Sequence, residues 1–230
     1  MSRKPDAVML FAAGFGTRMG ELTKNRPKPL IEVAGKALID HALDQVESFR
    51  DCKIVANTHY MANQIEAHLQ DRSILISREC PDILDTGGGL RNALPLLGDE
   101  PVFTMNTDSI WSGPNPLCVL ANAWNEDEMD ALLLCIPRNN AFGHKGRGDF
   151  LIDAHGRAAR GPGAIYSGLQ ILKTNGLSKV PQRVFSLNLL WDQMLARNAV
   201  HAIEYPGRWC DVGSPEGVDQ AKAMLADGDV

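Results

Sequence analysis

The sequence predicts an α/β fold in which a Rossmann-like, mixed but mainly parallel sheet is flanked by helices. Two observations favour this class. Short apolar runs of strand length alternate with amphipathic stretches of helical spacing, a pattern typical of parallel sheets covered on both faces. Glycine or aspartate follows several of these runs, at the sheet edge where α/β proteins bind ligands. With 230 residues, the chain can bury the core of one domain.

The individual elements are predicted from apolar periodicity. Apolar side chains recur at helical spacing between residues 35 and 50, which predicts the first helix. Strands are expected at 7–11, 53–57, 73–77, 101–106, 131–136, 149–152, 164–172 and 200–205. Further helices are expected at 62–69, through 93–97, at 115–124, at 186–197 and from Pro215 onward, with Ser186 and Ser214 as N-caps of the last two.

The composition narrows the class of protein. A net charge of -5 and a pI near 5.7 disfavour a general nucleic-acid or membrane-surface binder, because both need an excess of positive charge. No apolar run approaches the ~20 residues of a membrane span, and no secretory h-region is visible. The five cysteines are scattered without a Cys-x-x-Cys pair, which favours reduced thiols over a zinc site. We therefore expect a cytoplasmic protein.

The first predicted strand leads into a segment of small residues at 12–17. Gly14 and Gly16 let the backbone turn sharply and approach a ligand closely, because no Cβ is in the way. Exposed N–H groups in such a loop bind phosphate oxygens. Arg18 and Lys28 add positive charge suited to a polyphosphate, and the prolines on either side of Lys28 stiffen its segment. The sequence therefore predicts a nucleotide-phosphate site.

Two other phosphate-binding patterns do not fit this loop. The dinucleotide fingerprint G-x-G-x-x-G needs a third glycine where Met19 stands, and an acidic residue about twenty residues further on. The second predicted strand ends at 57–59 without one. No Gly-Lys-Ser or Gly-Lys-Thr of the Walker type occurs. A nicotinamide-dependent oxidoreductase is therefore disfavoured.

Two compound motifs resemble the signatures of the sugar-nucleotidyltransferases, and the resemblance covers essentially the whole chain. They are Ala12-Ala13-Gly14-x-Gly16-Thr17-Arg18 with Pro27-Lys28-Pro29-Leu30 downstream, and Trp209-x-Asp211-x-Gly213-Ser214-Pro215. The resemblance implies a GT-A-like nucleotide-diphospho-sugar transferase fold. It also implies one domain, 1–230, with a nucleotide-binding half at 1–137 and a sugar-binding half at 138–230 that ends in a helix. The residues implied to contact the nucleotide here are Ala12, Ala13, Gly14, Gly16 and Thr17.

Two aspartates are the candidate metal ligands. Asp108 follows the predicted strand 101–106, where an aspartate is also a common helix N-cap, a role that Ser109 could share. Asp211, taken alone, is a turn residue. The resemblance implies instead that Asp108 and Asp211 bind Mg²⁺, which bridges the substrate phosphates.

The base and the sugar are assigned to two glycine-containing segments. The residues Asp85-Thr86-Gly87-Gly88-Gly89 begin a predicted helix, where glycines permit either a tight turn or the approach of a flat base to free N–H groups. The resemblance implies that Thr86 and Gly87 read the base, and the segment looks most like the branch that includes N-acetylmuramate 1-phosphate uridylyltransferase. Gly168 is implied to lie against the sugar. Residues 160–163 lack the Glu-Lys pair of many relatives.

The implied reaction joins a nucleoside triphosphate, expected to be UTP, to a sugar 1-phosphate, expected to be N-acetylmuramate 1-phosphate. Arg18 would hold the departing phosphates, and Lys28 would bridge the α-phosphate and the incoming phosphate. The alternatives are a mannose-1-phosphate guanylyltransferase and a non-catalytic sensor of nucleotide sugars. We expect no nucleic-acid or membrane partner, and a monomer or small homo-oligomer.

Overall fold

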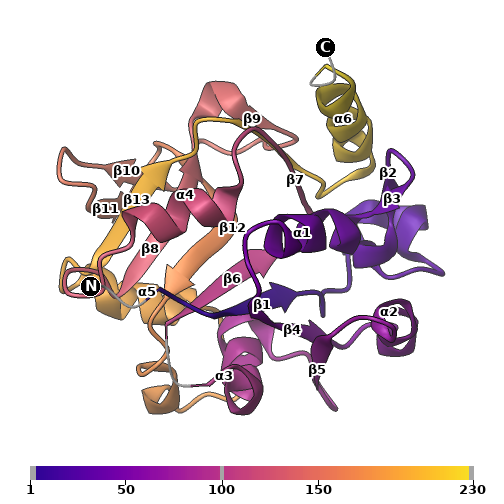
Figure 1. Cartoon of the computed structure of the whole chain (residues 1–230), viewed down its shortest axis with the longest axis horizontal. Coiled ribbons are helices and arrows are strands. Elements are labelled where there is room, and N and C mark those ends of the chain that lie inside the picture. The colour runs from indigo at the N-terminus through magenta and orange to yellow at the C-terminus, as the bar shows by residue number, and fades with distance from the viewer. Residues whose placement is uncertain (1–3, 99–100, 228–230) are drawn as a thin grey trace.

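The structure is a computed structural model of the whole chain and describes residues 4–98 and 101–227. A seven-stranded sheet with the order β13-β8-β12-β6-β1-β4-β5 forms its centre (Figure 1). Only β12, Ile165–Leu172, runs antiparallel to its neighbours within this sheet. The remaining strands are β1 Ala7–Phe11, β4 Lys53–Thr58, β5 Ile74–Arg78, β6 Val102–Asn106, β8 Ala131–Ile136 and β13 Val200–Glu204. The predicted class, a mixed and mainly parallel sheet, is confirmed.

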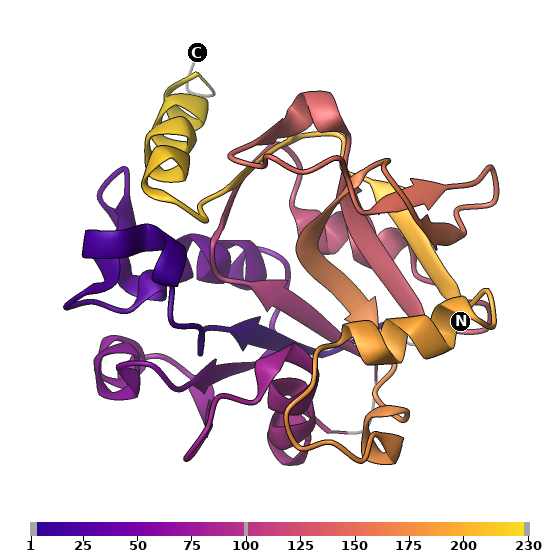
Figure 2. The ribbon, with the colours of Figure 1, turned by 180° about the vertical axis from the view of Figure 1, so that it is seen from behind.

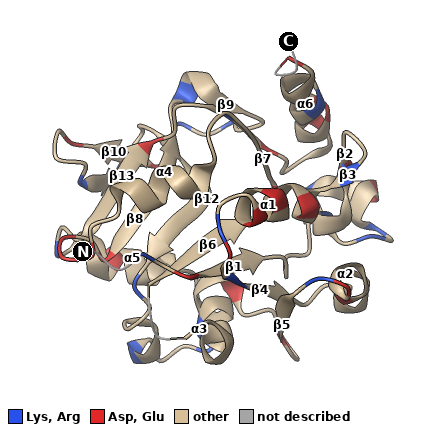
Figure 3. Cartoon of the chain, viewed as in Figure 1, with Lys and Arg blue, Asp and Glu red and all other residues tan. Residues whose placement is uncertain are grey.

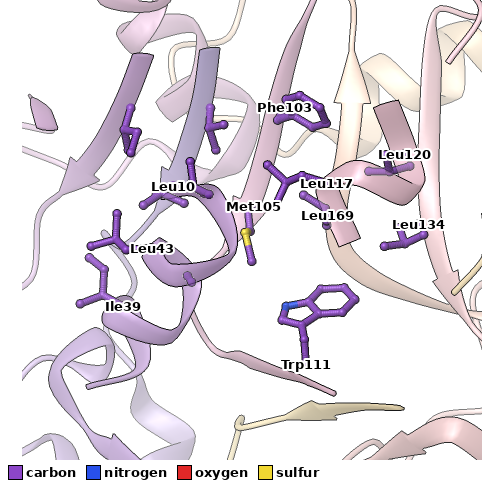
Figure 4. Close-up of a cluster of buried hydrophobic side chains, with 14 of the residues drawn as sticks. Leu10, Ile39, Leu43, Phe103, Met105, Trp111, Leu117, Leu120, Leu134 and Leu169 are labelled. Atoms are coloured by element: carbon purple, nitrogen blue, oxygen red, sulfur yellow. The ribbon is translucent and has the colours of Figure 1, made fainter. Parts of the chain in front are cut away.

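Helices cover both faces of this sheet, as the two opposite views show (Figures 1 and 2). One face carries α1 Leu38–Glu47, α2 Ala62–Leu69 and α4 Pro116–Ala123. The other carries α3 Asp85–Leu97 and α5 Asn188–Leu195. Figure 4 shows the first of these interfaces, where side chains of α1 and α4 pack on residues of the central strands such as Leu10, Phe103 and Met105. Burial on both faces explains why the strands read as continuous apolar runs.

Smaller elements surround the central sheet. β7 Ser109–Ser112, β14 Arg208–Asp211 and β9 Ala141–Phe142 form a three-stranded sheet, and α6 Pro215–Ala226 follows it. Two hairpins are formed by β2 Glu32–Val33 with β3 Lys36–Ala37 and by β10 Phe150–Ile152 with β11 Ala158–Arg160. The 3-10 helices are η1 Thr17–Thr23, η2 Lys28–Leu30, η3 Arg138–Asn140 and η4 Leu177–Lys179.

A separate apolar cluster ties α6 to η1. Met19 of η1 packs with Val218 and Met224 of α6, and all three side chains are buried. η1 contains Arg18, and α6 follows β14, which ends at Asp211. This cluster therefore fixes the position of residues 12–17, called the phosphate loop below, relative to Asp211.

Most predicted elements are confirmed, with three corrections. Ser186 is not the N-cap of α5, because this helix begins at Asn188 and Leu187 holds the N-cap position. Ser109 does not begin a helix, because it starts β7 and pairs with Asp211 of β14. The first helix starts at Leu38 rather than at residue 35, because Lys36 pairs with Val33 in a hairpin. Ser214 caps α6 as predicted, since its hydroxyl accepts a hydrogen bond from the N–H of Gly217 at 3.4 Å.

Charged residues are spread over helices and loops of the chain (Figure 3). On α1, for example, Asp44 pairs with Lys36, whereas Asp40 and Glu47 pair with Arg72. Within residues 4–98 and 101–227, no helix has both the length and the apolar character that crossing a bilayer requires.

Candidate active site

A cavity opens at the carboxyl ends of β1, β4 and β6. β1 lies between the other two strands, so the chain crosses over in opposite directions on its two sides, which is where open α/β sheets bind ligands. The lining residues are Phe11, Ala12, Ala13, Gly14, Lys28, Pro29, Asn57, Glu79, Ile83, Asp85, Thr86, Asn106, Thr107 and Asp108. The predicted phosphate loop, one predicted metal ligand and one predicted base-reading residue therefore share one cavity.

The two glycines of the phosphate loop have different surroundings. A Cβ on Gly16, whose φ is +65°, would lie 2.8 Å from the Cβ of Lys28, so this glycine lets the loop fold onto the lysine stem. A Cβ on Gly14 would meet nothing within 4 Å. The N–H of Ala12 is already used within the protein, because it donates to Oδ1 of Asn57 at 2.7 Å. Of the two glycines, Gly14 is the one that lines the cavity and has open space where a Cβ would lie.

Lys28 and Asp108 form an ion pair at the centre of the site. The Nζ of Lys28 donates to Oδ2 of Asp108 at 2.6 Å, and the two side chains are only 12% and 25% exposed. The lysine lies between two prolines at the start of η2, and the aspartate follows β6 directly. Two elements far apart in the sequence thus bring opposite charges together beside the phosphate loop.

Asp211 lies next to this pair. β14 runs antiparallel to β7 with Asp211 opposite Ser109, and the N–H of Val212 donates to the carbonyl of Asp108 at 2.8 Å. Burial, followed by the charge of Asp108, raises the pKa of the Asp211 carboxyl, whereas the positive charges of Lys28, Arg18 and His144 act in the opposite direction. The structure therefore brings the two predicted metal ligands together.

The guanidinium group of Arg18 also lies beside Asp211. A Cβ added to Gly213 would lie 3.0 Å from both Nη1 of Arg18 and Oδ2 of Asp211. Glycine at position 213 therefore leaves room for the guanidinium group beside the carboxylate. Arg18, Lys28, Asp108 and Asp211, which the sequence motifs selected, all lie around one point.

The donor set fits a magnesium ion. Two carboxylates held close together raise each other's energy, and a hard cation that prefers oxygen ligands relieves this repulsion. In the described part of the chain, no group of three or more His, Cys, Asp or Glu side chains could form a complete metal cage. Mg²⁺ is commonly held by one or two carboxylates, with water and substrate phosphates as the remaining ligands.

The glycines at the start of α3 serve a purpose that the sequence did not reveal. The N–H groups of Gly87 and Gly88 both donate to the carbonyl of Phe185, at 2.9 and 3.0 Å, and a Cβ on Gly87 would lie 2.4 Å from the Phe185 ring. The expectation of free N–H groups facing a flat ligand is therefore wrong for the structure as it stands. Thr86 lines the cavity, while its hydroxyl accepts from the N–H of Leu187 at 3.0 Å.

Gly168 also contacts protein. It has a φ of +84° at an irregularity in β12, and a Cβ there would lie 2.7 Å from Cγ of Asn106. Asn106 lines the cavity, so Gly168 acts on the site by making room for this side chain. Sequence reasoning assigned no role to Asn106, although it stands two residues before Asp108.

Further residues missed by sequence reasoning surround the carboxylates and the loop. Gly143, with a φ of +76°, packs so tightly on Asp211 that a Cβ would lie 2.2 Å from its carbonyl oxygen. The next residue, His144, has a buried Nε2 without a hydrogen-bond partner. Asn57 and Glu79 lie on the cavity wall and are 3% exposed. None of these residues stands in a motif, so only the tertiary structure could identify them.

Alanine substitutions at Gly87 and Gly14 should differ in which property they change, the stability of the fold or the affinity for triphosphate. In Gly87→Ala the new methyl group collides with Phe185, so we expect a loss of about 1–3 kcal/mol of unfolding free energy. In Gly14→Ala the methyl group meets open space, so stability should be unchanged while triphosphate affinity falls. Chemical denaturation and calorimetric titration with triphosphate would measure the two effects. Normal stability of Gly87→Ala would contradict the packing role.

The fold and the site together place the chain among α/β proteins that bind a nucleoside triphosphate at a sheet edge. Residues 8–161 match the family described as the MobA-like NTP transferase domain, and the chain belongs to this family. It is 39% identical to N-acetylmuramate alpha-1-phosphate uridylyltransferase of Caulobacter vibrioides, over 99% of this chain and 100% of that protein. The resemblance to sugar-nucleotidyltransferases is thereby confirmed.

One further relative and one solved structure show how far the similarity extends. A mannose-1-phosphate guanyltransferase of Hypocrea jecorina is 28% identical over 90% of this chain and 61% of its own length. The solved inositol-1-phosphate CTP transferase of T. maritima superposes with a TM-score of 0.77 and covers 99% of each chain, at 16% identity. That identity supports the fold alone.

Proposed function

We propose that the protein transfers a uridylyl group from UTP to N-acetylmuramate 1-phosphate, releasing pyrophosphate. The observation that carries this proposal is the convergence of Arg18, Lys28, Asp108 and Asp211 beside the phosphate loop. The choice of base and sugar rests on the uridylyltransferase that is 39% identical over nearly the full length.

In the proposed reaction, an oxygen of the sugar 1-phosphate attacks the α-phosphorus of UTP in line. The bond from the α-phosphorus to the oxygen that bridges the β-phosphate breaks, and pyrophosphate leaves with that oxygen. The attacking phosphate is already an anion, so no protein nucleophile is needed. The barrier lies in bringing anions together in the right orientation.

The charged residues lower this barrier in different ways. Lys28 lies deep in the site, where its ammonium group would neutralise the α-phosphate and the incoming phosphate. Arg18 is more exposed, and its planar fork would hold the departing β- and γ-phosphates. Asp108 and Asp211 would hold Mg²⁺, which when bound supplies positive charge that offsets the repulsion among the phosphates.

The rest of the site follows from the same proposal. The nucleotide would contact Gly14 and the neighbouring backbone of Ala12, Ala13, Gly16 and Thr17, with Thr86 and Gly87 beside the base and Gly168 on the sugar side through Asn106. Residues 1–137 would thus bind the nucleotide and residues 138–230 the sugar. A cytoplasmic location and a monomeric or small homo-oligomeric state belong to the proposal as well.

A panel of nucleoside triphosphates and sugar 1-phosphates, read out as pyrophosphate release with Mg²⁺, tests the function. We expect UTP to exceed GTP by at least about tenfold in kcat/KM with N-acetylmuramate 1-phosphate, which needs only ~1.4 kcal/mol of differential binding. A preference for GTP with mannose 1-phosphate, the activity named for the Hypocrea jecorina relative, would overturn the substrate choice. Binding of nucleotide sugars without any pyrophosphate release would instead support a non-catalytic sensor.

A further inference from the structure

Glu79 is a buried carboxylate on the wall of the cavity that the proposed reaction does not use. It follows β5 directly, and its residue is 3% exposed. Its two oxygens accept hydrogen bonds from neutral groups, Oε1 from Nδ2 of Asn57 at 2.7 Å and Oε2 from the N–H of Leu84 at 2.6 Å. A carboxylate is costly to bury, so its position needs an explanation.

The hydrogen bonds form a chain that begins at the phosphate loop. The N–H of Ala12 donates to Oδ1 of Asn57 at 2.7 Å, and Nδ2 of the same amide donates to Glu79. A backbone N–H can only donate, and an ionised carboxylate can only accept. Both neighbours therefore require the same orientation of the Asn57 amide, and that orientation is unambiguous.

The second oxygen of Glu79 extends the chain of hydrogen bonds to the start of α3. Leu84 immediately precedes α3, whose first residues, Asp85 and Thr86, line the cavity. Gly89, one turn into α3, leaves the required space, because a Cβ there would lie 2.5 Å from Oε1 of Glu79 and 3.0 Å from Nδ2 of Asn57. The third glycine of the run thus accommodates this pair rather than a ligand.

We infer that Glu79 is a positioning residue that joins the two ends of the nucleotide subsite. Through Asn57 it holds the start of the phosphate loop at Ala12, and through Leu84 it holds the start of α3 beside Thr86. The inference rests on the proposed function for the statement that these two segments bind one nucleotide. The hydrogen-bond chain itself is independent of that function.

Glutamine at position 79 keeps the shape but breaks the pattern of acceptors. Its amide has one accepting oxygen, so the Leu84 N–H and the Asn57 Nδ2 cannot both be satisfied while Asn57 still accepts from Ala12. Either Leu84 loses its acceptor, or Asn57 turns over and Ala12 loses its own. Glu79→Gln should therefore release one of two identified backbone N–H groups.

Amide hydrogen exchange in the nucleotide-free protein measures directly whether one of these N–H groups has lost its hydrogen bond. In Glu79→Gln, protection of Ala12 or Leu84 should fall at least about tenfold, whereas Asn57→Ala should affect Ala12 alone. Glu66→Gln is the matched control: this glutamate also accepts two hydrogen bonds near the end of β4, from Thr58 and Arg78, but it does not line the cavity. The control should change neither amide.

Steady-state kinetics supply the functional readout. We expect Glu79→Gln to raise the KM for UTP by at least about tenfold and to leave the KM for the sugar 1-phosphate within about twofold, because only the nucleotide subsite loosens. Unchanged protection at both amides would overturn the inference, as would equal losses for both substrates. If Glu79→Gln does not fold, Asn57→Ala applies the same test at Ala12.

The two proposals can fail separately. If the wild-type protein releases no pyrophosphate with any substrate pair, the proposed function fails, while the exchange experiment still decides the role of Glu79. If the wild-type protein is active and Glu79→Gln matches it in exchange and in both KM values, the positioning role fails and the proposed function stands.

Discussion

Replacing Asp211 with asparagine is expected to lower turnover by roughly a thousandfold while leaving the metal-free fold at least as stable as the wild type. Loss of one carboxylate from a metal site removes several kcal/mol of transition-state stabilisation, and about 4 kcal/mol corresponds to that factor. Asparagine keeps the size of the side chain, so the antiparallel pairing of β14 with β7 should persist.

The stability half of this prediction follows from the raised pKa of Asp211. Burial and the charge of Asp108 raise this pKa on folding. A carboxyl group whose pKa is raised stabilises the fold while protonated and loses this contribution as the pH rises through its folded-state pKa. At a pH above the folded-state pKa, the charge of Asp211 therefore opposes folding of the metal-free protein, and asparagine removes that charge.

Thermal unfolding with and without Mg²⁺ tests both halves. The wild type should gain stability when Mg²⁺ is added, because an ion held as proposed would bind the folded state preferentially, and Asp211→Asn should gain much less. Asp219→Asn is a suitable control, since this aspartate is exposed on α6 and pairs only loosely with Lys222 at 3.7 Å. Near-normal turnover of Asp211→Asn at limiting Mg²⁺ would sink the assignment.

Asp211 is a cleaner target for this test than Asp108. Asp108 is the ion-pair partner of Lys28, whose side chain is only 12% exposed. Its replacement would leave a largely buried ammonium group without a partner, which is destabilising by itself. A loss of activity in Asp108→Asn would therefore mix metal binding with the stability of the site.

The parts of the fold that the sequence could predict are those with local causes. The central strands are apolar on both faces, so they appear as uninterrupted runs, and Ser214 caps the helix that it precedes. The strands β2, β3, β9 and β11 have only two or three residues each, too few for a period to be visible. β2, β3 and β11 form through hairpin pairing, and β9 forms because it pairs with β14, which is distant in the sequence.

The candidate site also contains residues that the sequence could identify and residues that only the tertiary structure identifies. Arg18, Lys28, Asp108 and Asp211 stand in motifs, and the structure brings them together as the sequence suggested. The run Gly87-Gly88-Gly89 predicted either a tight turn or the approach of a flat base, and it gave no sign of the protein groups that pack there. The neighbours that fill the space are Phe185, the Arg183 carbonyl and Glu79. Two of these come from the other half of the chain, where no spacing rule could connect them to α3.

Replacing Lys28 with methionine is expected to slow the chemical step by about a hundredfold to a thousandfold, the usual effect of removing one charged group that stabilises a transition state. UTP affinity should fall by a smaller factor, because the proposed contacts of Arg18 and the phosphate loop with the triphosphate would remain. The stem of Lys28 packs against the loop at Gly16, and methionine preserves most of that packing. Lost packing of the stem should therefore contribute little to the effect.

Rapid-quench measurement of a single turnover at saturating UTP separates the chemical step from binding. Lys24→Met is the matched control, because Lys24 lies in the same segment but its side chain is 68% exposed and its partner is Glu21, outside the cavity. This control should retain the wild-type rate, since no charge is removed from the site. A Lys28→Met protein that binds UTP weakly but reacts at the normal rate once saturated would mean that Lys28 only binds substrate. In that case the charge that stabilises the transition state would have to come from Arg18 and the metal ion alone.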